Sequence, residues 1–462
     1  MAAGDETGRA LDTAHRLAQE YIAGLAGRDV FPAATSAEEL RARLGGPLPV
    51  GSRDPATVLE ELAAAAEPGL VATAGGRYFG FVTGGAVPAA VGADWLAATW
   101  DQNAAFEVMS PAAAAVEEVC RGWLAELLGL PANVTLALTT GCQMAHVACL
   151  AAARHRVLAD VGWDVEEQGL AGAPPIRVVC GVQRHVTVDR ALRFLGIGRA
   201  AIRAVPCDSQ GRVDVAALAA ELERLGPGPT IVIAQAGEVN TGAFDDIAGV
   251  AAAARAAGAW LHVDGAFGLW AAGSPRLAPL LAGSELADSW ASDGHKWLNV
   301  PYDCGLAFCT DAAAHRAALT MSAAYLAAAP EGRRDATDWT PESSRRARGF
   351  AVYAAIRSLG RDGIRAMVER CCEQAQALAA GIGALPGAEI ANDVVLNQVL
   401  VRFADDATTA QVLAAVQASG ETWMGSTSWQ GRLAIRISVS NWRTTGDDVA
   451  RTVAAFAAAV AS

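Results

Sequence analysis

The sequence predicts an α/β protein in which a mostly parallel β-sheet covered by helices is followed by a smaller α/β domain. Between about residue 70 and Asp311, short runs rich in β-branched residues alternate with alanine-rich segments. That alternation is typical of buried parallel strands and their covering helices. After residue 347, one long helical segment precedes two further strand-like runs. A chain of 462 residues that is 52% hydrophobic can bury a core of this size.

The expected elements follow in chain order. An amphipathic helical pattern extends from about Gly8 to Ala65 and ends at the turn-forming residues of "EPGL". The strands of the alternating region are expected at 133–140, 176–182, 230–237 and 260–267. A polar loop is expected at 329–346, before a helix from Arg348 and the strand-like runs "DVVLNQVLVRF" and "RLAIRISVSN". We therefore divide the chain into an N-terminal helical segment (1–75), a large domain (76–328), a mobile loop (329–346) and a small domain (347–462).

Bulk properties exclude several classes of function. The net charge is −13 and the arginines are scattered, so no basic surface is expected and nucleic acid is not an expected partner. No apolar run is long enough to span a bilayer, and the first residues do not resemble a secretory signal. The nine cysteines are dispersed without metal-ligand spacing, which predicts reduced thiols, no metal site and a cytoplasmic protein.

Lys296, in "SDGHKWLNVPYDCG", is the only lysine in the chain. A compositional bias towards arginine explains why the other lysines are missing, but it does not explain why this one remains. Arginine keeps its proton at any accessible pH, whereas a lysine can lose it and become an amine nucleophile. The position therefore indicates chemistry that needs an amine.

Three further features follow strand ends, where ligands bind in parallel α/β sheets. They are the turn Gly141 to Gln143 at a helix start, His185 after the second run, and Asp264 at the end of "WLHVD". Each alone is more often structural, as a turn, a cap or a local ion pair. Together with Lys296 they fit pyridoxal 5′-phosphate (PLP). The helix start would bind the phosphate, Asp264 the ring nitrogen and His185 one ring face, and Lys296 would form the Schiff base.

On these residues the chain resembles the group II PLP-dependent amino acid decarboxylases, the family of aromatic-L-amino-acid and glutamate decarboxylases. The most specific segments are "HVDGAFG" and "SDGHKWLNVPYDCG"; "YFGFVTGGAVPAAVGADWL", "TTGCQMAHVACL" and "RHVTVDRALRFLG" also match, and the resemblance covers nearly the whole chain. It implies fold type I, the aspartate-aminotransferase-like fold, with a seven-stranded sheet. It also implies a homodimer interlocked by its N-terminal helices.

The resemblance implies a role for each matching residue. Lys296, His185 and Asp264 would be catalytic, and His185 would stack on the cofactor ring. The cofactor would contact Gly141, Cys142, Gln143, His185, Asp264, Ala266, Asp293, His295 and Lys296. Phe81 and Thr83 would line the substrate pocket, and Tyr302 would reach into the neighbouring subunit's site.

Two departures from the family pattern bear on the reaction. Gly237, Glu238 and Val239 stand where many members have Gly-Thr-Thr, so a threonine hydroxyl near the cofactor is missing. If Trp339 matches the tryptophan of the family's mobile loop, Ala336 takes the place of the tyrosine that protonates the substrate carbon; Tyr325 lies upstream.

These observations leave alternatives open. The first is decarboxylation of an L-amino acid to an amine, and the "YFGF" segment favours an aromatic or apolar substrate. The second is a decarboxylation diverted by oxygen, which yields an aldehyde, ammonia and hydrogen peroxide. An aminotransferase or another lyase of the same fold is also compatible. A catalytically inactive binding subunit would not need to keep Lys296.

Overall fold

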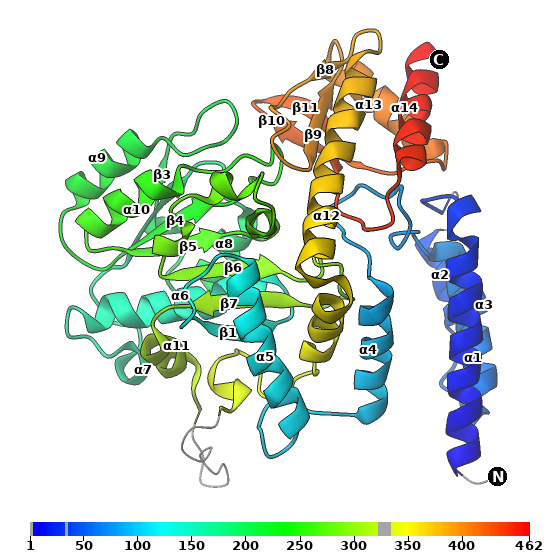
Figure 1. The fold of residues 1–462 in the computed structure, drawn as a ribbon, viewed down its shortest axis with the longest axis horizontal. Helices are drawn as coiled ribbons and strands as arrows, with labels where there is room; N and C mark the ends of the chain where they lie inside the picture. The colour runs from blue at the N-terminus through cyan, green and yellow to red at the C-terminus, as the bar shows by residue number, and fades with distance from the viewer. Residues whose placement is uncertain (1–2, 33–35, 322–333) are drawn as a thin grey trace.

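The structure is a computed structural model that describes residues 3–32, 36–321 and 334–462 (Figure 1). Its centre is a seven-stranded sheet in the order β1-β7-β6-β5-β4-β2-β3. Only β7 runs antiparallel to its neighbours, β1 and β6, so the predicted mostly parallel sheet is confirmed. The strands are β1 (Thr135–Thr139), β2 (Arg177–Gly181), β3 (Ile202–Val205), β4 (Thr230–Gln235), β5 (Trp260–Asp264), β6 (Ser289–Asp293) and β7 (Gly305–Cys309).

Both faces of this sheet are buried, as expected for parallel strands. Alternate residues of one strand enter different hydrophobic clusters, as Val178 and Val179 of β2 show. Val178 packs in the cluster that includes α6 and α8, whereas Val179 packs in the cluster that includes α9 and α10. Two-sided burial explains why these strands have apolar runs rather than an apolar–polar alternation.

The helices begin at recognisable caps. Aspartates precede several of them, and Asp214, Asp246, Asp311 and Asp405 each accept a backbone N–H of the first turn. The helices are α1 (Ala3–Gly24), α2 (Ala37–Leu44), α3 (Pro55–Ala66), α4 (Pro88–Trp100), α5 (Pro111–Leu127), α6 (Cys142–Ala159), α7 (Val165–Gln168), α8 (Val186–Phe194), α9 (Val215–Leu225), α10 (Ile247–Ala256), α11 (Ala312–Leu319), α12 (Gly349–Gly383), α13 (Asp406–Ala418) and α14 (Gly446–Ala461).

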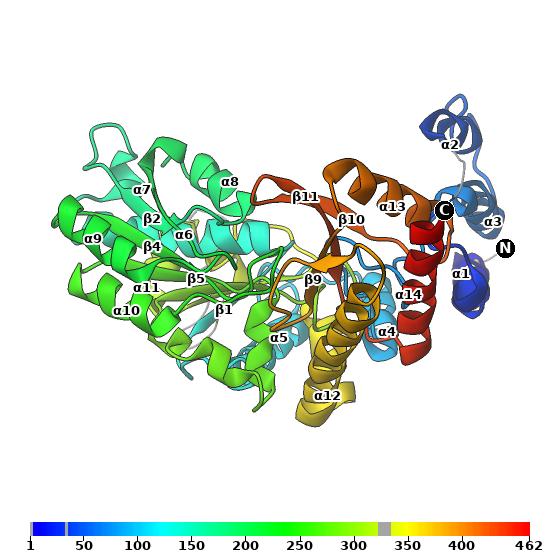
Figure 2. The same ribbon diagram turned by 90° about the horizontal axis from the view of Figure 1, so that it is seen from above.

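A second, four-stranded antiparallel sheet forms the small C-terminal domain, in the order β10-β11-β9-β8. Its strands are β8 (Glu389–Ile390), β9 (Gln398–Arg402), β10 (Gly425–Trp429) and β11 (Arg432–Ser438), and α13 and α14 accompany them. The long helix α12 leads from the large sheet towards this domain (Figures 1 and 2) and is interrupted at Gly360, whose backbone is not helical.

The N-terminal helices lie beside the rest of the molecule, where α1 and α3 pack against each other (Figure 1). The predicted helical segment forms three helices, and the stretch "GGPLPVGSRD" between α2 and α3 is rich in turn-forming residues. The predicted domain boundaries stay predictions. Within the described ranges, no helix combines the length and the apolar content that crossing a membrane requires.

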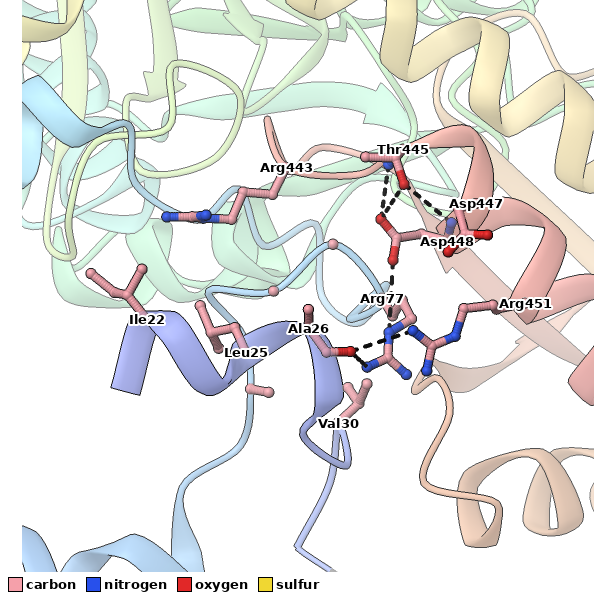
Figure 3. A pocket seen from close by; sticks show the side chains of 13 residues that line it. Ile22, Leu25, Ala26, Val30, Arg77, Arg443, Thr445, Asp447, Asp448 and Arg451 are labelled. Atoms are coloured by element: carbon pink, nitrogen blue, oxygen red, sulfur yellow. Dashed lines mark hydrogen bonds and ion pairs between the residues drawn. The ribbon is translucent and has the colours of Figure 1, made fainter. Parts of the chain in front are cut away.

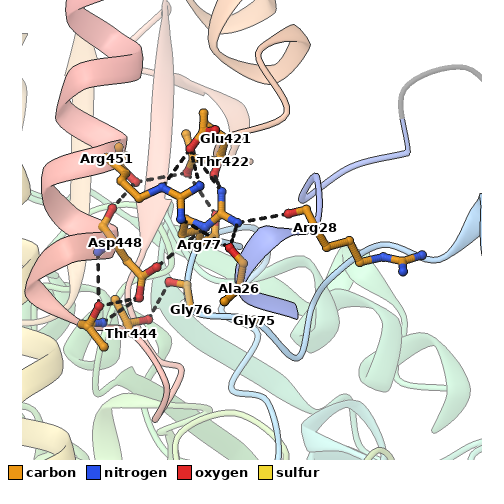
Figure 4. A network of polar contacts seen from close by, with 12 residues as sticks. Ala26, Arg28, Gly75, Gly76, Arg77, Glu421, Thr422, Thr444, Asp448 and Arg451 are labelled. Atoms are coloured by element: carbon orange, nitrogen blue, oxygen red, sulfur yellow. Dashed lines mark hydrogen bonds and ion pairs between the residues drawn. The ribbon is translucent and has the colours of Figure 1, made fainter. Parts of the chain in front are cut away.

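Arg77 joins the N-terminal segment to the small domain (Figure 4). Its buried guanidinium donates to the carbonyls of Ala26 at 3.1 Å and Arg28 at 3.0 Å, and also to the carbonyl of Glu421. A cavity of about 290 Å³ lies beside this junction, between the end of α1 and the start of α14 (Figure 3). One side chain thus satisfies three carbonyls from two distant parts of the chain.

Candidate active site

The strand ends of the large sheet surround one cavity of about 320 Å³. The carboxyl ends of β1, β2, β4, β5 and β6 lie at the same edge because these strands share one direction. All nine residues predicted to contact the cofactor line this cavity: Gly141, Cys142, Gln143, His185, Asp264, Ala266, Asp293, His295 and Lys296. The structure therefore brings the predicted set together, and the assignment of a role to each member stays a prediction.

Lys296 follows β6, and its ammonium lies 3.1 Å from the Asp293 carboxylate. Burial would lower the pKa of Lys296, but Asp293, with help from Asp264, outweighs this effect and raises it. The ammonium also lies 5.9 Å from the centre of the Phe267 ring. In the free chain Lys296 is thus charged, and it must lose a proton before it can act as a nucleophile.

The backbone of Lys296 is fixed from the other side by Gly84. A Cβ at position 84 would lie 1.7 Å from the Lys296 carbonyl oxygen, so only glycine permits this approach. Gly84 follows the Phe81–Thr83 segment that the sequence placed at the substrate pocket. The residue that directly follows this segment is therefore in close backbone contact with the lysine.

Asp293 connects the lysine to the start of α6. Its Oδ1 accepts the Cys142 N–H at 2.6 Å and lies 3.5 Å from His295 Nε2. The residue at the N-cap of α6 is Gly141, which has no side chain to cap the helix, so the carboxylate takes that role. Because the Cys142 N–H was predicted to bind phosphate, binding there requires Asp293 to give way.

Asp264 ends β5 and is almost completely buried. Its Oδ1 accepts the Ala266 N–H at 3.2 Å, and its Oδ2 lies 3.5 Å from His146 Nε2. Burial would raise the pKa of Asp264, but His146, His185 and Lys296 together hold it well below its usual range. The carboxylate is therefore ionised, as a partner for a protonated ring nitrogen must be.

His185 caps α8 and also lines the cavity. Its Nδ1 accepts the Thr187 N–H at 3.4 Å and lies 2.7 Å from the Thr187 hydroxyl. An accepting Nδ1 leaves the proton of the neutral ring on Nε2. Burial lowers the pKa of His185, so the ring is neutral near pH 7 and keeps a single N–H that can be donated.

The three predicted substrate residues do not line this cavity, although Tyr302 contacts His295, which does. The Tyr302 ring is tilted over His295 at 4.5 Å, and Thr83 is buried beside Gly84. Phe81 is 67% exposed and stacks on Trp423 at 5.8 Å; Tyr78 stacks on the same indole at 5.0 Å. Whether Tyr302 reaches a neighbouring subunit stays a prediction.

The segment that departs from the family pattern is stabilised internally. The buried Glu238 carboxylate accepts the backbone N–H groups of Asn240 at 2.7 Å and Thr241 at 2.8 Å. Arg436 of β11 donates to the Val239 carbonyl at 3.5 Å, and Val239 lines the cavity. Burial lowers the pKa of Arg436, which Glu238 partly offsets. A largely buried guanidinium therefore lies near the cavity.

The predicted loop is only partly described. Tyr325 and residues 329–333 lie outside the described residues. Ala336 begins a short 3₁₀ turn, η7 (Ala336–Asp338), and Trp339 follows it. The Trp339 ring meets His315 edge-on at 5.4 Å and packs on the cluster that includes Cys142. Trp339 is thus anchored against the helix that starts at the cavity.

Six further residues line the cavity. Gly237 and Val239 belong to the segment in which the sequence departs from the family pattern, whereas the sequence did not identify Thr140, Thr187, Gln235 and Phe267. Gln235 ends β4, so the rule of inspecting strand ends would have found it. His146, which contacts Asp264, gives no such signal because it lies one turn inside α6.

The cavity fits PLP in its charges and its open groups. The start of α6 would bind a phosphate once Asp293 releases the Cys142 N–H, and Asp264 is an ionised partner for the ring nitrogen. The amine of Lys296 lines the same cavity. The Gln143 Oε1 atom is buried without a partner among the described residues, as expected of a polar atom beside a ligand or water.

Comparison with known proteins identifies the family. Residues 48–404 match the pyridoxal-dependent decarboxylase conserved domain. The L-2,4-diaminobutyrate decarboxylase of Rhizobium meliloti (strain 1021) is 31% identical over 366 residues, which are 76% of this chain and 70% of that protein. The aromatic-L-amino-acid decarboxylase of Bacillus atrophaeus is 26% identical over 388 residues, or 81% and 78% of the two chains. The phenylacetaldehyde synthase of Arabidopsis thaliana is 25% identical over 355 residues, or 72% and 71%.

Among solved structures, Oryza sativa TDC crystallised with PLP and tryptamine superimposes with a TM-score of 0.93. It is 23% identical, and the superposition covers 100% of this chain and 98% of that one. This likeness shows the fold, which is fold type I as the sequence predicted. The family match spans well over half of the chain. The chain therefore belongs to the pyridoxal-dependent decarboxylase family and is a PLP-dependent carbon–carbon lyase.

Proposed function

We propose that the protein decarboxylates an apolar or aromatic L-amino acid and releases the amine and carbon dioxide. The observation that carries this proposal is the convergence of Lys296, Asp264 and His185 on one cavity at the strand ends. Aromatic-L-amino-acid decarboxylase of Bacillus atrophaeus, among the relatives, supports the substrate class.

Each of the three residues has a distinct task in this proposal. When bound, PLP withdraws electrons from the bond that loses carbon dioxide. Lys296 would hold the cofactor through its amine, which lines the cavity. Asp264 keeps the proton on the ring nitrogen, because its own pKa is held low. His185 would lie against one ring face and, in its protonated form, would give a proton to the substrate carbon.

The surroundings of the cavity support the substrate class. The stacked rings of Tyr78, Trp423 and Phe81 provide an aromatic surface next to the segment that contacts Lys296. Arg436 provides a cation that attracts the substrate carboxylate towards the cavity. An aromatic side chain would then lie against the exposed Phe81 ring.

Two measurements test the proposal. The first is a screen of single L-amino acids for carbon dioxide release by the holoenzyme, with amine formation measured in the same samples. The second is borohydride reduction followed by mass mapping, which should place a pyridoxyl group on Lys296. A pyridoxyl group elsewhere would refute the site, whereas release from acidic amino acids alone would refute the substrate class.

The second candidate is a decarboxylation that oxygen diverts. One amino acid, one O₂ and one water would give one aldehyde, carbon dioxide, ammonia and hydrogen peroxide. If Trp339 matches the tryptophan of the family's mobile loop, Ala336 stands where the loop tyrosine would donate a proton, and this favours the diverted reaction. A phenylacetaldehyde synthase is also among the relatives. Peroxide formed in equal amount to carbon dioxide would establish it and overturn amine formation.

We further propose that the protein is a cytoplasmic homodimer. Leu11 and Ile22 of α1 and Leu62 of α3 are exposed apolar residues on helices that lie beside the body of the chain. Burying them in a second copy would remove this apolar surface from water. All nine cysteines are free thiols, which suits a reducing compartment. Light scattering after size exclusion tests the dimer; a monomer at micromolar concentration would contradict it.

A further inference from the structure

A continuous chain of buried polar contacts extends from Asp264 into the core behind the cavity. His146 Nε2 lies 3.5 Å from Asp264 Oδ2, and His146 Nδ1 lies 2.9 Å from His262 Nε2. His262 Nδ1 in turn lies 2.9 Å from the Ser289 hydroxyl. That hydroxyl accepts the Trp260 Nε1–H at 2.9 Å. The chain therefore ends at a group that can only donate.

The chemistry of these groups sets the direction of the hydrogen bonds. Since the indole N–H must donate, the Ser289 oxygen accepts it, and the Ser289 hydroxyl is free to donate to His262 Nδ1. A neutral His262 then carries its proton on Nε2 and donates to His146 Nδ1. A neutral His146 then carries its proton on Nε2, which faces the Asp264 carboxylate.

The opposite direction of these hydrogen bonds is unfavourable when both histidine rings are neutral. If His262 donated to Ser289, it would accept from His146 Nδ1, and the lone pair of a neutral His146 Nε2 would face the carboxylate. Only a doubly protonated His146 would avoid that repulsion. In both acceptable arrangements, the nitrogen facing Asp264 carries a hydrogen.

Burial favours a neutral His262. His146, His262 and Ser289 are each 0% exposed. Burial, together with His146, lowers the pKa of His262 to about 3, so this ring is neutral at any pH at which the protein would work. Apart from His146, the charged or titratable groups that act on Asp264 are His185 and Lys296. Both of them line the cavity, whereas His146 approaches from the core.

We propose that His146 is a positioning residue that, held by His262 and Ser289, keeps Asp264 ionised and aimed at the cofactor ring nitrogen. This inference rests on the proposed role of Asp264. Among the described residues, the other hydrogen-bond donor to this carboxylate is the Ala266 N–H, at 3.2 Å. One weak donor does not offset the burial of a carboxylate, so the second donor is required.

Cys142 is the other neighbour of the same nitrogen, with its Sγ 3.5 Å from His146 Nε2. Burial, with Asp293 and Asp264, raises the pKa of Cys142 well above its usual value, so the thiol is neutral. A neutral thiol competes poorly with a carboxylate for an N–H donor. Cys142 therefore does not divert His146 from Asp264.

The test compares His146→Leu and His146→Gln in the holoenzyme reconstituted with ¹⁵N-labelled PLP. Solid-state NMR distinguishes a protonated from an unprotonated ring nitrogen, and a pH series gives its pKa. In His146→Leu this pKa should fall by about 1–3 units relative to wild type. His146→Gln, which keeps a side-chain donor, should recover part of that shift. If the His146→Leu variant and the wild type have the same ring-nitrogen pKa, the proposal is wrong.

Ser289→Ala provides a second variant that leaves both histidines in place. It removes the hydroxyl that orients His262, and the ring-nitrogen pKa should fall less than in His146→Leu. If His146→Leu does not fold, Ser289→Ala and His146→Gln provide the test. An unchanged ring-nitrogen pKa in both variants would refute the role of this series of hydrogen bonds. Borohydride mapping of each variant separates the two proposals. A pyridoxyl group on Lys296 together with an unchanged ring-nitrogen pKa would refute only the role of His146. The absence of a pyridoxyl group from Lys296 in the wild type would refute the site itself.

Discussion

The Asp293 carboxylate lies 3.1 Å from the Lys296 ammonium, and through its other oxygen it accepts the N–H of Cys142 at the start of α6. One side chain thus holds the future nucleophile in its charged form and occupies the first donor of the helix predicted to bind phosphate. Both contacts must change when the cofactor enters.

Asp293→Asn should therefore shift the pH dependence of cofactor attachment. Attachment needs the unprotonated amine, and the pKa of Lys296 is raised above its ordinary value, so the wild-type rate should still be rising in the ordinary lysine range. Without the carboxylate charge, burial dominates and the pKa falls. The midpoint should move to lower pH by about one unit or more, as followed by growth of visible absorbance after mixing apoenzyme with PLP. Asparagine can still accept the Cys142 N–H, so an unchanged or higher midpoint would contradict the charge argument.

Gly84→Ala should impair cofactor attachment without unfolding the protein. The new Cβ would meet the Lys296 carbonyl oxygen at 1.7 Å, so the lysine backbone must move by more than an ångström. A displacement of that size costs about 100-fold in activity. Gly92→Ala is the matched control, because its Cβ meets nothing within 4 Å and it lies in α4. Equal activity in the two variants would show that the Gly84 contact does not position Lys296.

Arg77→Leu should destabilise the junction between the N-terminal segment and the small domain. The substitution leaves the carbonyls of Ala26, Arg28 and Glu421 without this donor, at a cost of about 3 kcal/mol in the free energy of unfolding. The midpoint of urea unfolding measures the change. Arg443→Leu is a control for the loss of positive charge in the same cavity, since that guanidinium stacks on Trp442 instead. A similar loss in both variants would point to charge rather than to the carbonyl contacts.

Ala336→Tyr should raise the share of amine among the products if oxygen diverts the wild-type reaction. A phenol at this position would restore the proton donor that the family's loop tyrosine provides, and a general acid contributes about 100-fold or more to proton transfer. Product analysis by mass spectrometry with parallel peroxide measurement gives the ratio. Ala336→Phe has the same ring without the hydroxyl, so an equal ratio in both variants would show that the phenol donates no proton.

The sequence predicted the elements that have a strong local signal. The runs at β2 and β4 are rich in β-branched residues because both sheet faces are buried, and β5 is apolar at Trp260, Leu261 and Val263. It did not identify β6, whose sequence "SWASD" has two serines and an aspartate. That strand is held by pairing with β5 and β7 on both sides, which no local pattern records.

The candidate site was likewise predictable only for residues that lie at the ends of recognisable strands. Asp264, His185 and the Gly141 turn each follow a recognisable strand, so their convergence could be expected from topology. The contact of Asp293 with Cys142 depends on the packing of β6 beside α6, 151 residues apart in sequence. His146 faces Asp264 only because α6 crosses the sheet at one particular rotation. Such relationships arise from tertiary packing, and the sequence alone could not show them.

Because Lys296 is the only lysine, digestion can also report the fraction of enzyme molecules that carry the cofactor. A protease that cleaves only after lysine should cut the denatured chain once, into residues 1–296 and 297–462. A cofactor fixed to that side chain by reduction would block this cut. The ratio of intact to cleaved chain on a gel would then report the fraction of molecules that carried the cofactor, without a spectrum or an assay.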